Sequence, residues 1–178
     1  MAVAAAAVTV LAACSSGSQA SSSSTASAPA AAATRTFTSR PYHFSFSYDP
    51  DRLSPSRSPY PLETFNVFFS PKGDHGEMIL LAYRGRRPVT SAGLRQWLTR
   101  VVRSYAPDSE PRRITATEVG GLPAFVSTSV AGGTLRTVTY VCGRGRYAYL
   151  FSLQGDRHRW PELKPAYLQV VRSFQVVE

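Results

Sequence analysis

Glycine-containing turns divide the second half of the chain into β-rich runs. The runs span residues 113–119, 124–130, 135–142 and 147–153 and are rich in Val, Thr, Tyr and Phe. They are followed in turn by Gly120-Gly121, Gly132-Gly133, Gly143-Arg144-Gly145 and Gly155-Asp156. Runs of this length, separated by glycine turns at this spacing, predict consecutive β-hairpins. This part of the chain is therefore predicted to fold as an antiparallel meander of four strands.

The first half of the chain contains further strand patterns. In residues 42–48, aromatic side chains alternate with His or Ser, which predicts a half-buried strand. Residues 66–70 and 78–84 are the next predicted strands. The segment 71–76 between them contains Pro, Gly, Asp and Lys and predicts a turn.

Two segments show the periodicity of helices. In residues 91–105 the apolar positions follow the i, i+3, i+4, i+7 pattern, so this segment predicts an amphipathic helix that buries Trp97 against the sheet. Thr90 or Ser91 can cap its start, and Pro107 ends it. Residues 160–171 predict a second helix, which Pro165 weakens, and residues 173–177 predict a short final strand. The order of elements indicates an α+β fold, a mainly antiparallel sheet with helices packed on it.

The N-terminal segment is typical of a bacterial lipoprotein. Residues 1–13 are apolar but too few to span a membrane as a helix, and they suit the core of a signal peptide. They end in Leu11-Ala12-Ala13-Cys14, which resembles a lipobox, so we expect cleavage before Cys14 and lipidation of its thiol. No Lys or Arg precedes the apolar stretch, although an export signal normally opens with one, so the natural start codon is left open.

The segment after Cys14 predicts a tether. Residues 15–34 are mostly Ser and Ala, with no aromatic or branched aliphatic side chain, and cannot bury enough surface to fold. The predicted organisation is a signal peptide (1–13), a lipidated cysteine with a flexible linker (14–34) and one folded domain (35–178). This organisation places the domain on the extracytoplasmic face of the cell membrane, held by its lipid anchor.

The charge of the chain is strongly positive and belongs to the folded domain. The net charge is +9, and no charged residue precedes Arg35. Arginines cluster near predicted strand ends. We single out Arg84, Arg86, Arg87, Arg144 and Arg146 as residues that could bind an anionic surface; Arg112 with Arg113 and Arg157 with Arg159 form two more clusters. If these clusters share one edge of the sheet they form a basic rim; the alternative is dispersed charge that only aids solubility.

The sequence offers no recognisable catalytic, cofactor or metal site. The three histidines, His43, His75 and His158, are not paired at a metal-ligand spacing, and no nucleophile-elbow motif is present. Cys142 lies in an apolar run, which favours a buried side chain over a reactive thiol. No nucleic-acid-binding motif accompanies the basic charge, so nucleic acid is not an expected partner.

Three short segments resemble a known family. They are Phe44-Ser45-Phe46-Ser47-Tyr48, Gly120-Gly121-Leu122-Pro123-Ala124-Phe125 and Val170-Val171-Arg172-Ser173-Phe174. With the order of elements, they make the chain similar to the PsbP-like superfamily, and in particular to the actinobacterial LpqN/LpqT-type lipoproteins. The sequence departs from the family at residues 49–53, where many relatives have Pro followed by Trp. The resemblance implies an α/β/α sandwich that acts as a non-enzymatic binding or scaffold module.

Two classes of function remain open at this point. The first is a membrane-anchored, non-enzymatic module that binds an envelope protein or an anionic envelope polymer. The second is a small-ligand carrier or an enzyme whose site is assembled only in three dimensions. A deep pocket with convergent polar groups would favour the second class, and a flat or grooved basic surface would favour the first.

Overall fold

The four runs separated by glycine turns are consecutive antiparallel strands in the computed structural model, as the sequence predicts. They are β6 (Thr115–Val119), β7 (Leu122–Ala131), β8 (Leu135–Arg144) and β9 (Tyr147–Asp156). Each strand pairs with the next along the chain. Gly120 and Gly121, in the first of the turns, have φ values of 56° and 75°, a backbone conformation that glycine adopts without steric cost.

The structure describes residues 33–57, 63–69, 76–105 and 113–177. The expected signal peptide, Cys14 and the linker as far as residue 32 lie outside these ranges. So do most of the predicted turn at 71–76, the helix-ending Pro107, and Arg112 of the second arginine cluster.

The meander forms one half of a larger sheet. Beyond β9 come β5 (Gly76–Arg84), β4 (Glu63–Phe69) and β3 (Leu53–Arg57). Within the described residues this sheet has seven strands in the order β3-β4-β5-β9-β8-β7-β6, and every pairing is antiparallel. The strand β3 was not predicted, because its apolar content is low and Pro55 interrupts it. Its place at the sheet edge explains the proline, which cannot donate to a neighbouring strand.

A second, smaller sheet carries the predicted aromatic strand. It consists of β1 (Arg35–Ser39), β2 (Phe44–Tyr48) and β10 (Gln175–Val176), all antiparallel, within the described part of the chain. The strand predicted over 42–48 begins only at Phe44, because the preceding residues turn the chain. In this turn His43 has a φ of 54° and its N–H donates to the carbonyl of Arg40 at 3.3 Å. The strand β1 had not been predicted.

The two helices are those expected from the periodicity. They are α1 (Ser91–Tyr105) and α2 (Trp160–Ser173). Thr90 caps α1, since its Oγ1 accepts the N–H of Gly93 at 3.1 Å and its carbonyl accepts the N–H of Leu94 at 2.9 Å. Helix α2 continues through Pro165 to Ser173, two residues beyond the predicted end.

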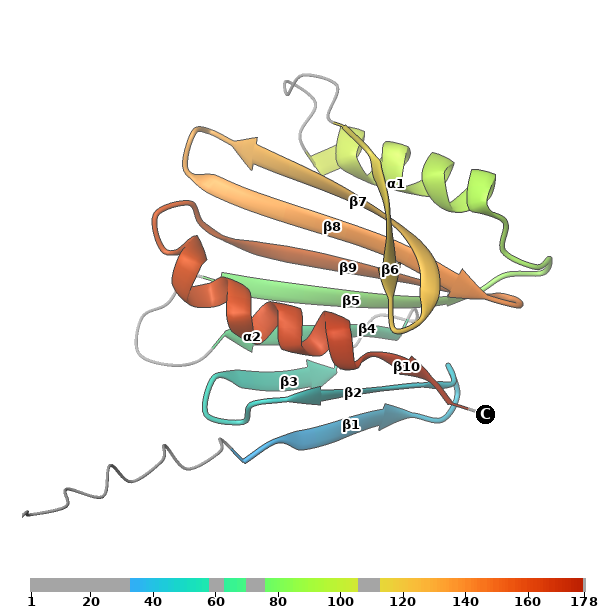
Figure 1. Ribbon diagram of the computed structural model, residues 1–178, viewed down its shortest axis with the longest axis horizontal. Coiled ribbons are helices and arrows are strands. Elements are labelled where there is room, and N and C mark those ends of the chain that lie inside the picture. The colour runs from blue at the N-terminus through green and yellow to red at the C-terminus, as the bar shows by residue number, and fades with distance from the viewer. Residues whose placement is uncertain (1–32, 58–62, 70–75, 106–112, 178) are drawn as a thin grey trace, which may run out of the picture. The chain divides into compact units, whose positions relative to one another are not determined.

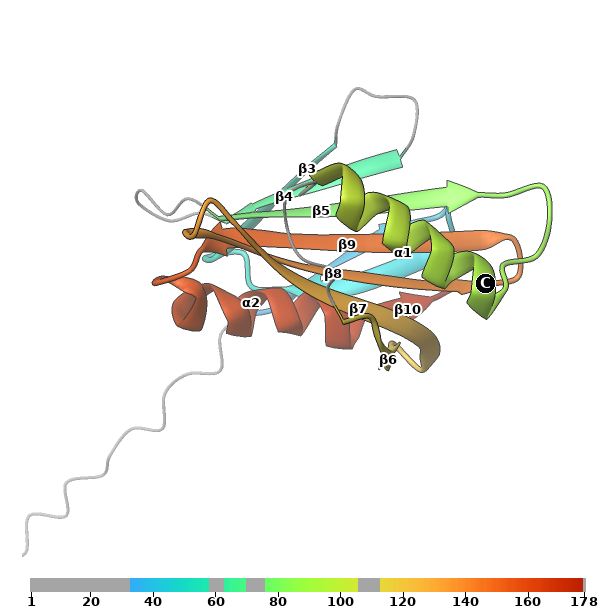
Figure 2. The ribbon, with the colours of Figure 1, turned by 90° about the horizontal axis from the view of Figure 1, so that it is seen from above.

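The helices cover opposite faces of the large sheet (Figures 1 and 2). Helix α1 lies against β7 and β8, and α2 lies between β9 and the small sheet. Successive residues of β9 point to opposite faces, so Leu150 packs with α1 while Tyr149 and Phe151 pack with α2. The α+β class and the α/β/α sandwich are therefore confirmed, with the small sheet added to the layer that contains α2.

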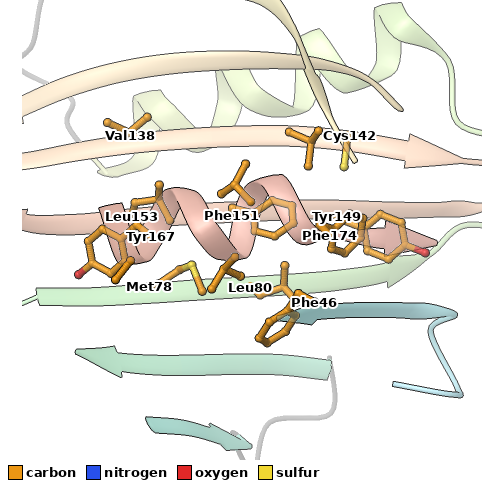
Figure 3. Close-up of a cluster of buried hydrophobic side chains, with 14 of the residues drawn as sticks. Phe46, Met78, Leu80, Val138, Cys142, Tyr149, Phe151, Leu153, Tyr167 and Phe174 are labelled. Atoms are coloured by element: carbon orange, nitrogen blue, oxygen red, sulfur yellow. The ribbon is translucent and has the colours of Figure 1, made fainter. Parts of the chain in front are cut away.

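The main core lies between the large sheet and α2 and is rich in aromatic side chains (Figure 3). Phe174, directly after α2, is at its centre and is fully buried. Its ring centroid lies 4.9 Å from that of Tyr149, 5.0 Å from Phe151 and 5.7 Å from Phe44. The buried hydroxyl of Tyr149 donates to the carbonyl of Tyr42 at 2.8 Å, so this polar group is satisfied.

A smaller core lies between α1 and the other face of the sheet. Its fully or nearly buried members are Leu94 and Leu98 of α1 with Val141, Ala148 and Leu150 of the sheet. The prediction that Trp97 is buried was wrong, because its side chain is only partly buried at the border of this cluster. The helix packs chiefly over β7 and β8, and Trp97 lies at its border together with residues of β5.

Candidate functional site

The structure brings the five singled-out arginines to one end of the large sheet, which we call the basic end. Arg84 ends β5, Arg144 ends β8, and both are in register with Tyr147 at the start of β9. Arg86 and Arg87 follow in the loop after β5, and Arg146 lies in the β8–β9 turn. All five side chains are exposed. These five residues therefore share one end of the sheet, which is one of the two arrangements that the sequence left open.

Backbone hydrogen bonds hold the two segments of the basic end together. The N–H of Gly85 donates to the carbonyl of Arg146 at 2.7 Å, and the N–H of Val89 donates to the carbonyl of Gly145 at 2.6 Å. The guanidinium carbon of Arg84 lies 5.7 Å from the centroid of the Tyr147 ring, a cation–π distance. The loop after β5 and the β8–β9 turn therefore form one connected surface.

No opposite charge neutralises the basic end within the described part of the chain. Residues 83–90 and 143–147 contain no Asp or Glu. The ion pairs that the described residues form, Arg52 with Asp49 and Arg159 with Glu162, lie elsewhere. Because no carboxylate of the described residues pairs with these five exposed arginines, the electrostatic potential at the basic end is positive and attracts anionic groups.

The cluster of Arg157 and Arg159 lies away from the basic end, so the described arginines do not form one continuous rim. Arg157 follows β9, and its N–H donates to the carbonyl of Thr134 in the β7–β8 turn at 2.7 Å. This turn is at the opposite end of β8 and β9 from Arg144 and Arg146. Antiparallel strands alternate in direction, so consecutive turns must fall at alternate ends of the sheet.

A groove runs from the basic end along α1. It has a volume of about 690 Å³ and is bounded by β5, the loop after β5, and α1. Its apolar walls come mainly from Leu81, Val89, Leu94, Trp97 and Val101, and Arg87 and Arg100 contribute positive charge. No Asp or Glu is among its described lining residues. Tyr83, at its border, is 51% exposed, which is high for a large aromatic side chain.

The groove was not predicted, because it depends on where α1 packs. The helix covers β7 and β8 and leaves the same face of β5 without a helix over it. The partial burial of Trp97 reflects this arrangement. The sequence pattern could not reveal it, because a tryptophan in the apolar stripe of a helix gives the same pattern whether it is fully or partly buried.

Groups suited to catalysis or metal binding are scarce in the described residues. Cys142 is fully buried, as predicted, and burial raises the pKa of its thiol to about 12, so the nucleophilic thiolate is suppressed at neutral pH. No set of three His, Cys, Asp or Glu side chains able to hold a metal ion occurs in the described ranges. His43 packs on the ring of Tyr147, with 5.0 Å between the ring centroids, and His75 lies outside the described residues.

Among the described residues, no helix is long and apolar enough to cross a membrane.

Comparison with known proteins identifies the fold. No family model matches the chain, and no curated protein matches it in sequence. Among solved structures, cyanobacterial PsbP (CyanoP) from Synechocystis has a TM-score of 0.60 at 11% identity, over 84% of this chain and 96% of that chain. A protein from Bacteroides thetaiotaomicron has a TM-score of 0.57 at 17% identity, over 80% of this chain and 48% of its own.

The LpqN protein of Mycobacterium tuberculosis, described as involved in cell envelope biogenesis, is also similar. The match has a TM-score of 0.45 at 12% identity and covers 83% of this chain and 86% of that chain. The PsbP-like fold expected from the sequence is thus confirmed by the match to CyanoP. At such low identity the likeness concerns the fold, and function has to be argued from the surface of this chain.

Proposed function

We propose that this chain is a non-enzymatic binding module of the cell envelope, lipid-anchored through Cys14 on the extracytoplasmic face, that contacts an anionic surface through its basic end. The proposal rests on one observation. Five arginines lie on one connected surface, and none of them forms an ion pair with Asp or Glu among the residues that the structure describes: Arg84, Arg86, Arg87, Arg144 and Arg146. The anionic surface is a membrane leaflet or an envelope polymer, and an acidic envelope protein is the remaining partner class.

Grouping the arginines at one end matters for the strength of binding. Each basic residue near an anionic membrane contributes about 1 kcal/mol, and the attraction decays over a Debye length of roughly 8–10 Å at physiological salt. Arginines grouped at one end can all lie within this distance of the anionic surface at once, whereas the same number of arginines spread over the domain cannot. A domain already tethered to the membrane also meets that surface at a high effective concentration.

The first test uses vesicles and a chain that lacks the anchor. A protein of residues 15–178 is expected to bind vesicles that contain anionic lipid and to leave neutral vesicles unbound. Replacing Arg144 and Arg146 with Gln removes two charges, so binding should weaken by about 2 kcal/mol, or about thirtyfold. The matched control, Arg95→Gln with Arg103→Gln, removes the same charge from exposed positions on α1 and should change binding much less. Vesicle co-sedimentation at several salt concentrations measures both.

Two outcomes would count against this function. Equal binding to neutral vesicles would show that charge is not the basis of the contact. An equal loss in the two double variants would show that net charge matters and the basic end does not. Binding to an anionic polymer but not to vesicles would instead assign the surface to a polymer.

The groove favours a second candidate function, a carrier for a single anionic amphiphile. Its volume of about 690 Å³ lies within the range of small-molecule sites, roughly 300–1,000 Å³. Apolar walls that include Trp97 suit an alkyl chain, while Arg87 and Arg100 suit an anionic headgroup. Arg87 belongs both to this groove and to the basic end, so an amphiphile could pass between the surface and the groove.

The fluorescence of Trp97 tests the carrier function. The chain has two tryptophans, and Trp160→Phe leaves Trp97 as the one that reports. Dodecyl phosphate, added below its micelle concentration, should shift the Trp97 emission to shorter wavelength as the alkyl chain displaces water. Arg87→Gln with Arg100→Gln should weaken the apparent affinity at least tenfold, since the loss of even one hydrogen bond to a charged group costs about 1.5–3 kcal/mol and about 1.4 kcal/mol is a factor of ten. An unchanged emission, or an equal response to dodecanol, would exclude the carrier function.

A further inference from the structure

A second, smaller pocket lies on the opposite face of the large sheet from the groove. It lies between α2 and strands β7, β8 and β9 and has a volume of about 260 Å³. Its lining includes Arg136, Val138, Tyr140, Leu153, Trp160 and Lys164. The lining combines apolar walls with two cationic side chains and contains no Asp or Glu.

Arg136 is the most unusual group in this pocket. Its guanidinium carbon lies 5.3 Å from the centroid of the Trp160 ring, so the cation is stacked on an almost fully buried aromatic surface. Its Nε is buried and has no hydrogen-bond partner among the described residues. None of the described carboxylates forms an ion pair with it. The Arg136 side chain as a whole is only partly buried and lines the pocket, so its guanidinium can donate to an anionic group there, and hydrogen bonds that involve a charged group are the stronger ones.

Further positive charge surrounds the same pocket. Lys164 lines its outer side from α2 and is exposed. Burial raises the pKa of Tyr140, and the positive charge of Arg172 opposes this rise, which shows that Arg172 acts on the Tyr140 side of the pocket. Lys164, Leu168 and Arg172 recur at every fourth position of α2 and therefore share one face of the helix.

We propose that this pocket binds a small organic monocarboxylate, with its carboxylate on Arg136 and Lys164 and its short apolar body against Val138 and Leu153. A guanidinium pairs with a carboxylate through two parallel N–H donors, a geometry that a single chloride ion cannot match. Apolar walls on most sides disfavour inorganic phosphate, which carries more charge and no apolar part. The volume is too small for the amphiphile considered for the groove, so the two sites are independent.

The two tryptophans allow the two sites to be observed separately. Trp160 lines the small pocket and Trp97 lines the groove. In the full chain carrying Cys14→Ser and Trp97→Phe, hexanoate should change the Trp160 emission in a saturable way at constant ionic strength. Hexanamide, which has the same shape without the charge, should produce no comparable change. In the matching Trp160→Phe protein, hexanoate should leave the Trp97 emission unchanged.

Variants then test the role of the two cations. Arg136→Gln is expected to raise the hexanoate Kd about tenfold or more, as for the loss of a hydrogen bond to a charged group. Lys164→Glu changes an exposed position and should also weaken hexanoate binding. It keeps the proposal testable if Arg136→Gln fails to fold. Circular dichroism checks the folding of both variants. Arg157→Gln is the matched control: it removes one exposed arginine from the neighbouring loop and should leave the Kd unchanged.

Any of four results would overturn the proposal. They are no saturable change of Trp160 emission with hexanoate, an equal response to hexanamide, a tighter response to inorganic phosphate, and a Kd for folded Lys164→Glu or Arg136→Gln equal to that of Arg157→Gln. None of these results bears on vesicle binding by the basic end, so the two proposals can fail separately.

Discussion

Replacing Phe174 with alanine is expected to lower the free energy of unfolding by about 3–5 kcal/mol, the usual cost of removing a large buried aromatic side chain. The side chain is fully buried and packs against Phe44 of the small sheet and against Tyr149 and Phe151 of the large sheet. Its loss would leave a cavity where the two sheets and α2 meet. Since domains of this size are stable by about 5–15 kcal/mol, the loss is a large fraction of the total.

Urea unfolding of residues 15–178, followed by circular dichroism, measures this change. Phe174→Leu keeps part of the apolar volume and is expected to cost clearly less than Phe174→Ala. A matched exposed control is Tyr83→Ala, because Tyr83 is 51% exposed and should contribute little to the core. Equal midpoints for Phe174→Ala and Tyr83→Ala would mean that Phe174 does not join the layers in the way the packing indicates.

Replacing Cys14 with alanine is expected to move nearly all of the protein from the detergent phase to the aqueous phase in a phase-partitioning experiment. The physical reason is that acyl chains contribute about 0.8 kcal/mol for each buried CH₂, so two or more chains hold a protein on the membrane stably. In this proposal the acyl chains supply the main part of the membrane attachment, and the basic end orients the domain.

The second cysteine supplies the control for this experiment. Cys142 is fully buried, and burial raises the pKa of its thiol, so this thiol is a poor acceptor for acyl chains. Cys142→Ala should therefore leave the partitioning unchanged. Mass spectrometry of the mature protein should find an acylated Cys14 at its N-terminus. If the wild-type protein partitions into the aqueous phase with Met1 intact, the lipoprotein proposal is wrong.

The elements of the fold could largely be predicted because their signals are local. The helix over 91–105 has the predicted bounds, since the apolar period and the Thr90 cap act within a few residues. The meander was predicted because glycine turns separate strands that pair with their neighbours along the chain. The strands β1 and β3 were missed, because polar edge strands carry little periodicity and depend on a partner strand for their conformation.

The meaning of individual glycines shows where local signals end. Gly120 and Gly121 both have positive φ and both predict the same hairpin turn. A Cβ at Gly120 would collide with the backbone carbonyl of Phe174, whereas a Cβ at Gly121 would meet nothing within 4 Å. The turn is thus encoded locally. The requirement for glycine at position 120 in particular depends on tertiary packing, because it arises from the close approach of Phe174, directly after α2.

For the candidate sites, the kinds of side chain available follow from the sequence, whereas their grouping depends on the packing of the elements. The excess of arginine, the two cysteines and the two tryptophans can be read directly from the chain. Only the packing places Arg84 and Arg144 on the two sides of Tyr147, puts Arg157 at the opposite end, and leaves Trp97 and Arg136 in the walls of two separate pockets. The physical reason is that turns and periodicities arise from interactions between near neighbours in sequence, whereas surfaces and pockets arise from strand order and helix docking, which join residues far apart in the chain.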